Sequence, residues 1–320
     1  MSSPRRMLES IWNDDIAKLE AFIGTKMELK LKNLPQSAVY KKTPWAAPNW
    51  PAHLDSINHK WSKNEPSPAE KYATAFGLDV KSFMDKVSAQ NGVDSRKLDT
   101  VCAKRAGATS GYCIPTWYGI CDAWAPASIF EQEPNCPVTF NGVTFQPMDV
   151  KALVTDVYDN VNVSAVYAGE RYYGTDDSID EYGSHTDYTY RDLNPGLLHI
   201  VATNLSGLLK KTFIIDRDAG AEVWNQPVVS FKVNKQTTLT PEKAAQKFGA
   251  QEYSWNNESK SIVYTNARLS WINETYTDGG LVASGLIKKF TVGATYDYLL
   301  ELDEDQNIAG ETKTRHRHQN

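Results

Sequence analysis

The stretch TWYGICDAWAPASIF, residues 116–130, places Cys121 two residues after a glycine and before an alanine-rich segment. This pattern predicts a helix with Cys121 in its first turn, and Pro126 predicts a kink because it removes one helical hydrogen bond. A helix N-terminus favours the thiolate and directs free backbone N–H groups toward an oxyanion beside the sulfur. We therefore interpret Cys121 as a candidate nucleophile, with a buried or disulfide-bonded cysteine as the structural alternative.

The order of helical and strand patterns predicts the fold class. Amphipathic spacing and capping signals predict further helices at residues 7–23, 67–77, 79–92, 146–158 and 241–248. Apolar runs bounded by turn residues predict strands at residues 197–203, 212–215, 262–271 and 296–302. Helices first and strands later are typical of an α+β fold.

Changes in composition divide the chain into three parts. An N-terminal helix and a wrap rich in Pro and Trp occupy residues 1–66, the domain that carries the candidate nucleophile residues 67–302, and a flexible tail residues 303–320. Residues 169–192 are polar, acidic and rich in Tyr, and predict a long surface loop. With 320 residues, 41% of them hydrophobic, the chain can bury one large core or two modest ones.

Charge and hydropathy argue against nucleic acid and membrane as partners of this chain. The net charge is −5 with both signs interspersed, so we expect no nucleic-acid partner. No apolar run approaches the roughly 18 residues of a membrane span, and the first residues lack a signal-peptide pattern. Sequons for N-glycosylation, which favour a secreted protein, begin at Asn162, Asn204, Asn257 and Asn273.

The other cysteines lie close to Cys121 in the sequence, at positions 102, 113 and 136. This clustering indicates a local disulfide framework, a metal site or a catalytic cysteine. Without a Cys-x-x-Cys pair, structural zinc is not expected. Beside a catalytic Cys121, Cys102, Cys113 and Cys136 can form one disulfide and leave one thiol, unless a disulfide captures Cys121 itself.

A thiol nucleophile needs an adjacent imidazole, and the imidazole needs an orienting partner. His199 lies in an apolar strand pattern, and Asp216 ends the next predicted strand. A hairpin would bring the two side chains together if register and facing agree. We therefore predict the triad Cys121, His199 and Asp216, with a core histidine as the structural alternative and Asp218 or Asn204 as competing orienters.

Residues 223–235, VWNQPVVSFKVNK, resemble the elicitor segment of the secreted transglutaminases of oomycetes. The Gly-x-Cys-x-Ala-Trp pattern at Cys121 also resembles the active-site helix of papain-like and transglutaminase-core enzymes. The other matching segments are SINHKW at 56–61, SPAEKYATAFGLDV at 67–80, ATSGYCIPTWYGIC at 108–121, NGVTFQPMDVKAL at 141–153 and GAEVWNQPV at 220–228. The chain departs from the family at Val229, usually Arg, at Asp122, where relatives have His, and after Leu302, where the family's ending is missing.

The resemblance implies a papain-like or transglutaminase-core arrangement, with the cysteine helix packed against an antiparallel sheet. It implies a secreted, extracellular or cell-wall-associated protein-glutamine γ-glutamyltransferase that joins Gln and Lys side chains of protein substrates through a cysteine thioester. It also implies a surface elicitor segment that a plant immune receptor recognises. The residues of that segment are Val223, Trp224, Asn225, Gln226, Pro227, Phe231 and Lys232.

Two features of the expected site follow from its chemistry. Acyl transfer to an amine must exclude water, so apolar walls are expected, and Trp117, Trp124 and Trp224 are the candidates. Ordinary core packing is the alternative for each of them. Papain-like enzymes complete the oxyanion hole with a Gln six residues before the cysteine. Pro115 stands there in this chain, so a second donor must come from elsewhere.

The resemblance also implies calcium, and two acidic clusters offer weak candidate ligands. They are Asp176, Asp177, Asp180 and Glu181, and Asp303, Asp305 and Asn307. The second cluster has the initial spacing of an EF-hand but lacks its glycine and its final glutamate. A solvated acidic surface is the alternative for both clusters.

Two other functions stay open from the sequence. A papain-like peptidase or a glutamine deamidase would use the same triad with water as acceptor. A non-catalytic elicitor or surface protein would keep the segment at 223–235 without the reaction, and a disulfide-bonded Cys121 would favour it.

Overall fold

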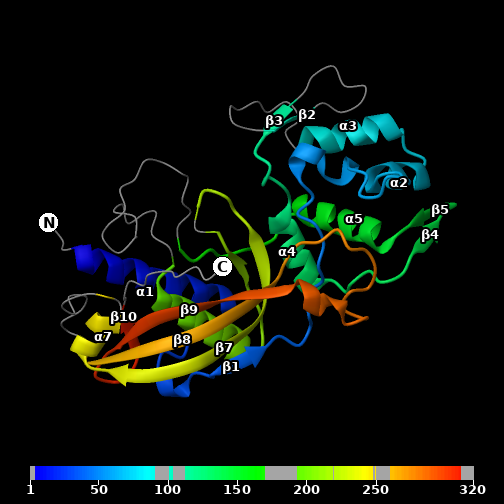
Figure 1. Ribbon diagram of the computed structural model, residues 1–320. Helices are drawn as coiled ribbons and strands as arrows, with labels where there is room; N and C mark the ends of the chain where they lie inside the picture. Colours follow the sequence, from blue (N-terminus) through cyan, green and yellow to red (C-terminus); the bar gives the residue numbers. More distant parts are fainter. Residues whose placement is uncertain are drawn as a thin grey trace.

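The protein, described here from a computed structural model, combines a curled antiparallel sheet with a group of helices and short hairpins (Figure 1). The structure describes residues 4–90, 101–103, 112–169, 193–218, 220–247, 249 and 260–310. Helix α4, Cys121–Phe130, lies where the sheet meets the helical part (Figure 1). The sequence prediction of an α+β fold with an antiparallel sheet is confirmed.

The main sheet has the strand order β1-β7-β8-β9-β10, and β6 also pairs with β7. All of these pairings are antiparallel. Its strands are β1 (Ser37–Val39), β6 (Ile214–Asp216), β7 (Asn225–Leu239), β8 (Ser261–Ile272), β9 (Thr291–Leu302) and β10 (Ile308–Gly310). Two hairpins lie outside it, formed by β2 (Val101–Ala103) with β3 (Tyr112–Ile114) and by β4 (Val138–Phe140) with β5 (Val143–Phe145).

The helices flank the sheet and build the helical part. The α-helices besides α4 are α1 (Pro4–Ile23), α2 (Pro68–Ala75), α3 (Val80–Gln90), α5 (Pro147–Asp159), α6 (Pro195–Val201) and α7 (Pro241–Lys247). Single-turn 3-10 helices occur at Leu31–Asn33, Ala52–Leu54 and Ser56–Asn58, a longer one at Leu286–Phe290, and a π-helix at Ala202–Leu208. The helices predicted at 7–23, 67–77, 79–92, 146–158 and 241–248 correspond to α1, α2, α3, α5 and α7.

A predicted strand at 197–203 is wrong, because these residues form α6 and the start of the π-helix. The Asn194 side chain accepts a hydrogen bond from the Leu197 N–H, and Pro195 occupies the first helical position. Both are strong helix-start signals. The apolar run that follows is buried almost all round, so its periodicity does not separate helix from strand.

The core consists of two large apolar clusters, one on either side of the junction. One surrounds α4 and contains Trp45, Trp50, Trp124 and Met148. The other packs α1 and α6 against β8, β9 and β10. Residues 308–310, expected in a flexible tail, pair with β9. Among the described residues, no helix is long and apolar enough to cross a membrane.

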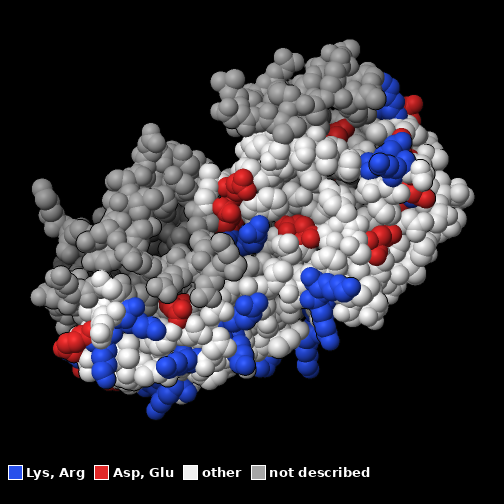
Figure 2. Space-filling view, viewed as in Figure 1, with Lys and Arg blue, Asp and Glu red and all other residues white. Residues whose placement is uncertain are grey.

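Charged side chains of both signs are spread over the face that Figure 2 shows, with Lys and Arg more frequent along the edge formed by the sheet. Most of the expected acidic loop, residues 170–192, lies outside the described residues, as do residues 311–320.

Candidate active site

Cys121 is the first residue of α4, as the sequence predicts, and its side chain is buried with 5% exposure. The start of the helix is held by a close approach of the segment around Asn49. The Ile120 N–H donates to the Asn49 carbonyl oxygen at 2.8 Å. A Cβ on Gly119 would overlap that same oxygen, so glycine is required there. The Ala123 and Trp124 N–H groups donate to the Ile120 carbonyl oxygen, so the N–H groups of Cys121 and Asp122 are the ones without an acceptor within the helix, next to the sulfur.

The segment at 223–227 lies directly against this sulfur. The Cys121 Sγ donates to the Val223 carbonyl oxygen at 3.7 Å, and the Asn225 Nδ2 donates to Sγ at 3.6 Å. Val223 and Asn225 both contact this sulfur, although they lie 102 and 104 positions after Cys121 in the sequence. The contact arises because α4 packs against the start of β7.

Opposing influences act on the pKa of the Cys121 thiol. Burial is the largest and raises the pKa, and the negative charges of Asp122 and Glu274 raise it further. The backbone and side-chain amides of Asn225 lower it by donating to sulfur. The net direction is upward, so burial and these charges favour the neutral thiol over the thiolate.

Asp216 lies beside this site, at the end of β6 and opposite Asn225 in the register of β6 and β7. Its Oδ1 accepts from the Trp224 N–H at 2.9 Å and from the Asp218 N–H at 3.2 Å. The carboxylate thus fixes the turn that carries the 223–227 segment toward Cys121. Asp218, a competing orienter, uses its own Oδ1 to accept from the Gly220 N–H at 2.8 Å.

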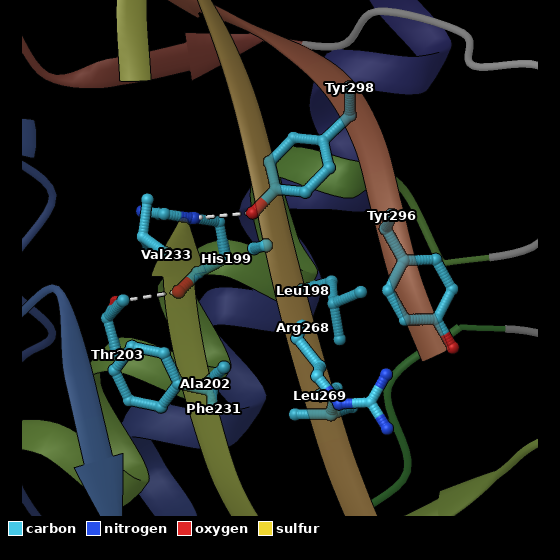
Figure 3. A pocket seen from close by; sticks show the side chains of 11 residues that line it. Leu198, His199, Ala202, Thr203, Phe231, Val233, Arg268, Leu269, Tyr296 and Tyr298 are labelled. Carbon is cyan, nitrogen blue, oxygen red and sulfur yellow. Dashed lines mark hydrogen bonds between the residues drawn. The ribbon is translucent and has the colours of Figure 1, made fainter. Parts of the chain in front are cut away.

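His199 is not brought together with Cys121. Its Nδ1 hydrogen-bonds the Tyr298 hydroxyl at 2.7 Å, and its side chain is only 3% exposed (Figure 3). Burial lowers its pKa to about 4. The imidazole borders a small cavity between α6 and the sheet, lined by Leu198, Tyr296 and Phe231 among others, and Cys121 does not line it. The position of His199 is that of a core histidine.

Asn204, the other competing orienter, is also a structural residue. Its side chain is 2% exposed, accepts from the Glu28 N–H at 2.8 Å and donates to the Glu28 and Ile200 carbonyl oxygens, both at 2.9 Å. A buried amide with these bonds cannot carry a glycan, so the sequon at this position is not a modification site in the folded protein.

The structure adds Glu274 to the site, which the sequence analysis missed. Its Oε1 accepts from the Gln226 Nε2, and burial raises its pKa while the charge of Arg217 opposes that rise. Its charge acts on Cys121. Glu274 follows β8 as the middle residue of the sequon that begins at Asn273, which gives no signal for a role beside a thiol, so only the pairing of β8 with β7 could have pointed to it.

The three predicted wall residues separate into two groups. Trp124 is fully buried, and its Nε1 donates to the Trp45 carbonyl oxygen at 3.2 Å, so it is a core residue and not a wall. Trp117 and Trp224 are partly exposed. The Trp117 ring contacts Tyr118 edge-on, and the Trp224 ring lies under the Arg217 guanidinium at 5.7 Å. Both stay candidates for walls.

The segment expected at the surface is only partly exposed. Val223, Trp224 and Asn225 are half-buried, Lys232 is exposed, and Gln226, Pro227 and Phe231 are buried. This is because β7 lies inside the sheet between β8 on one side and β1 and β6 on the other. Val229, where relatives have Arg, is 8% exposed within the apolar cluster around α4.

The candidate calcium ligands near the C-terminus are used by a local turn. Asp303 Oδ1 accepts from the Asp305 and Asn307 N–H groups, and its Oδ2 accepts from the Asn307 Nδ2 at 3.0 Å. Across the described ranges, no three His, Cys, Asp or Glu residues lie close enough to hold a metal ion. The other cluster, Asp176, Asp177, Asp180 and Glu181, lies outside the described residues.

Comparisons with known proteins agree with this geometry. The family model described as "Transglutaminase elicitor" matches residues 15–320. The crystal structure of the GP42 transglutaminase from Phytophthora sojae is similar at 53% sequence identity and a TM-score of 0.83, over 94% of this chain and 86% of that chain. A comparison with curated proteins finds no match. From its Cys121 helix, its curled sheet and these matches, the chain belongs to the transglutaminase elicitor family.

Proposed function

We propose that this chain is a protein-glutamine γ-glutamyltransferase with Cys121 as its nucleophile. The observation that carries the proposal is the position of Cys121 in the first turn of a buried helix, with the 223–227 segment against its sulfur. Free N–H groups at a helix start and a shielded thiol are what acyl transfer through a thioester requires.

The reaction proceeds in two stages. The Cys121 thiolate attacks the carboxamide carbon of a substrate glutamine, an Sγ–C bond forms, and the oxygen becomes an oxyanion. When the oxyanion collapses, the C–N bond breaks, and ammonia leaves with the proton that the Cys121 thiol had given to the general base. A lysine ε-amine then attacks the thioester and gives a proton to the same base. The C–S bond breaks, the isopeptide is released, and the base returns the proton to the Cys121 sulfur. The partly exposed rings of Trp117 and Trp224 would limit the access of water.

Family resemblance implies a Cys-His-Asp triad, and we propose Cys121 and Asp216 as two of its members. Asp216 lies on the strand next to Asn225, which contacts the nucleophile. His199 does not suit the third place, because its imidazole is enclosed and bonded to Tyr298. Single replacements of His53, His59 and His185 by Gln test which imidazole carries the proton, with the catalytic one expected to abolish transfer.

The remaining properties implied by the family are proposals of the same kind. We propose that the protein acts outside the cell, that it requires calcium, and that a plant immune receptor binds part of the 223–235 segment. Asp303 and Asn307 are poor calcium ligands, because their side chains already bond each other in a turn. We further propose a disulfide between Cys102 and Cys113, which lie opposite each other in the β2–β3 register.

The test is incorporation of a fluorescent primary amine into casein by the wild type and by Cys121→Ala, each with and without added calcium. We expect incorporation by the wild type alone. Ammonia release or peptide cleavage without amine incorporation would identify a deamidase or a peptidase instead. Incorporation by Cys121→Ala would refute the assignment of the nucleophile, and calcium-independent transfer would refute the metal requirement.

A further inference from the structure

The oxyanion formed during acyl transfer needs more than one hydrogen-bond donor. The start of α4 supplies backbone N–H groups beside Cys121. Residue 115, from which papain-like enzymes supply a side-chain amide, is a proline in this chain. A side-chain amide that adds to these backbone donors therefore comes from another element that reaches the sulfur.

Asn225 is the residue that reaches it. Its Nδ2 lies 3.6 Å from the Cys121 Sγ, about as close as the Val223 carbonyl oxygen at 3.7 Å. Asn225 is the first residue of β7 and pairs with Asp216 of β6, and the adjacent Gln226 is tied to Glu274. The strand register and the Gln226 bond fix the backbone around Asn225, and the contact with Sγ orients its side-chain amide before any substrate binds, which is the condition for an effective oxyanion donor.

The charges around the sulfur increase the need for a hydrogen-bond donor at this place. Asp122 and Glu274 both act on Cys121 as negative charges, and both would repel an oxyanion formed next to it. A neutral amide N–H offsets that repulsion without a countercharge. An oxyanion-hole donor has to come within about 3 Å of the oxyanion, and the oxyanion forms on the carbon bonded to Sγ, the atom that the Asn225 amide already contacts.

We propose that the Asn225 side-chain amide donates a hydrogen bond to the oxyanion of both tetrahedral intermediates, together with the backbone N–H groups at the start of α4. The inference rests on the proposed acyl transfer at Cys121. In each stage, the carbonyl π electrons move to oxygen as the new bond forms, and they return when the leaving group departs. The amide proton stays on Nδ2 throughout, so Asn225 neither gains nor loses a proton.

The test measures steady-state amine incorporation by Asn225→Ala and Asn225→Asp beside the wild type and Cys121→Ala. Asn234→Ala is the matched control, because Asn234 lies on the same strand and its Nδ2 bonds only the exposed Asn266 side chain among the contacts described. We expect kcat of Asn225→Ala to fall about 100- to 1,000-fold with KM little changed, which is the usual loss of one oxyanion donor. Asn225→Asp keeps the shape of the residue but presents a negative charge, so its kcat should fall at least as far.

A second measurement separates this role from an effect on the thiol. The pH dependence of Cys121 alkylation by iodoacetamide reports the thiol pKa in each folded variant. The inference predicts a loss of kcat that persists at pH values where the thiol is fully ionised. A kcat of Asn225→Ala within fivefold of wild type, or a loss that disappears at those pH values, would overturn it. If Asn225→Ala does not fold, Asn225→Asp carries the test. An inactive wild type would overturn the proposed function and this inference together.

Discussion

Replacing His199 with Gln tests whether its imidazole belongs to the core or to catalysis. In the native protein its pKa is lowered from 6.5 to about 4 by burial. Between these pH values the unfolded chain binds a proton that the native imidazole refuses, so stability falls as the pH falls. At 1.36 kcal/mol for each pKa unit, this one group removes about 3 kcal/mol of unfolding free energy from pH 6.5 to pH 4.

His199→Gln has no imidazole to titrate, so the difference between its unfolding free energy and that of the wild type should become smaller as the pH is lowered. At pH 7 we expect His199→Gln to lower the free energy of unfolding by about 1–3 kcal/mol, because the bond to Tyr298 is disturbed in a buried place. Toward pH 4 the difference from wild type should diminish by about 3 kcal/mol. Urea unfolding followed by tryptophan fluorescence at several pH values measures both quantities, with Tyr298→Phe as a companion variant that keeps the imidazole.

The same preparation decides the catalytic question. We expect folded His199→Gln to keep amine incorporation within a few-fold of wild type. A difference in unfolding free energy between variant and wild type that does not change with pH would refute the argument that burial lowers the pKa of His199. A folded variant of unchanged stability that has lost all transfer would show that His199 acts in catalysis.

Three further predictions follow from the geometry around Cys121. Glu274→Gln removes a negative charge that raises the thiol pKa, so alkylation of Cys121 by iodoacetamide at pH 7 should become faster, and an unchanged rate would contradict the electrostatic reading. Gly119→Ala forces a methyl group against the Asn49 carbonyl oxygen and should lower the unfolding free energy by about 1–3 kcal/mol in urea titrations. An unfolding free energy equal to that of the wild type would show that the backbone around Asn49 moves away from the methyl group at no cost. Peptide mapping without reduction should link Cys102 to Cys113 and find Cys136 alkylated in the native state, since Cys136 is an exposed free thiol; a linked Cys121 or Cys136 would contradict the register argument.

Much of the fold could be predicted from local sequence. The helix at Cys121 was predicted because glycine, cysteine and an alanine-rich run form a strong local pattern, and the confirmed helices α2 and α5 both begin with capping boxes. The strand prediction at 197–203 failed because a wholly buried apolar run lacks the polar positions that reveal its period. The strand β7 was not predicted as a strand, since polar residues occupy much of its exposed half.

The site was harder to predict than the fold because it is built from long-range contacts. Cys121 and Asp216 could be found as a helix start and a strand end. Asn225 was noticed as part of a recognisable segment, but its contact with sulfur depends on how α4 packs against β7. His199 was assigned to the site because a hairpin was assumed there. These residues form a helix, and in that helix the imidazole bonds the Tyr298 hydroxyl.

Two of the contacts to the Cys121 sulfur, those with the Val223 carbonyl oxygen and the Asn225 side chain, restrict sequence variation to different degrees. At Val223 the contact uses the backbone carbonyl oxygen, which every amino acid possesses, so the identity of this side chain is invisible to the thiol. At Asn225 the contact uses a side-chain amide, which few replacements can reproduce. If the sulfur contacts matter for the reaction, position 225 has to keep its side chain, whereas position 223 can accept other residues. A library of single substitutions should show tolerance at 223 beside near-invariance at 225.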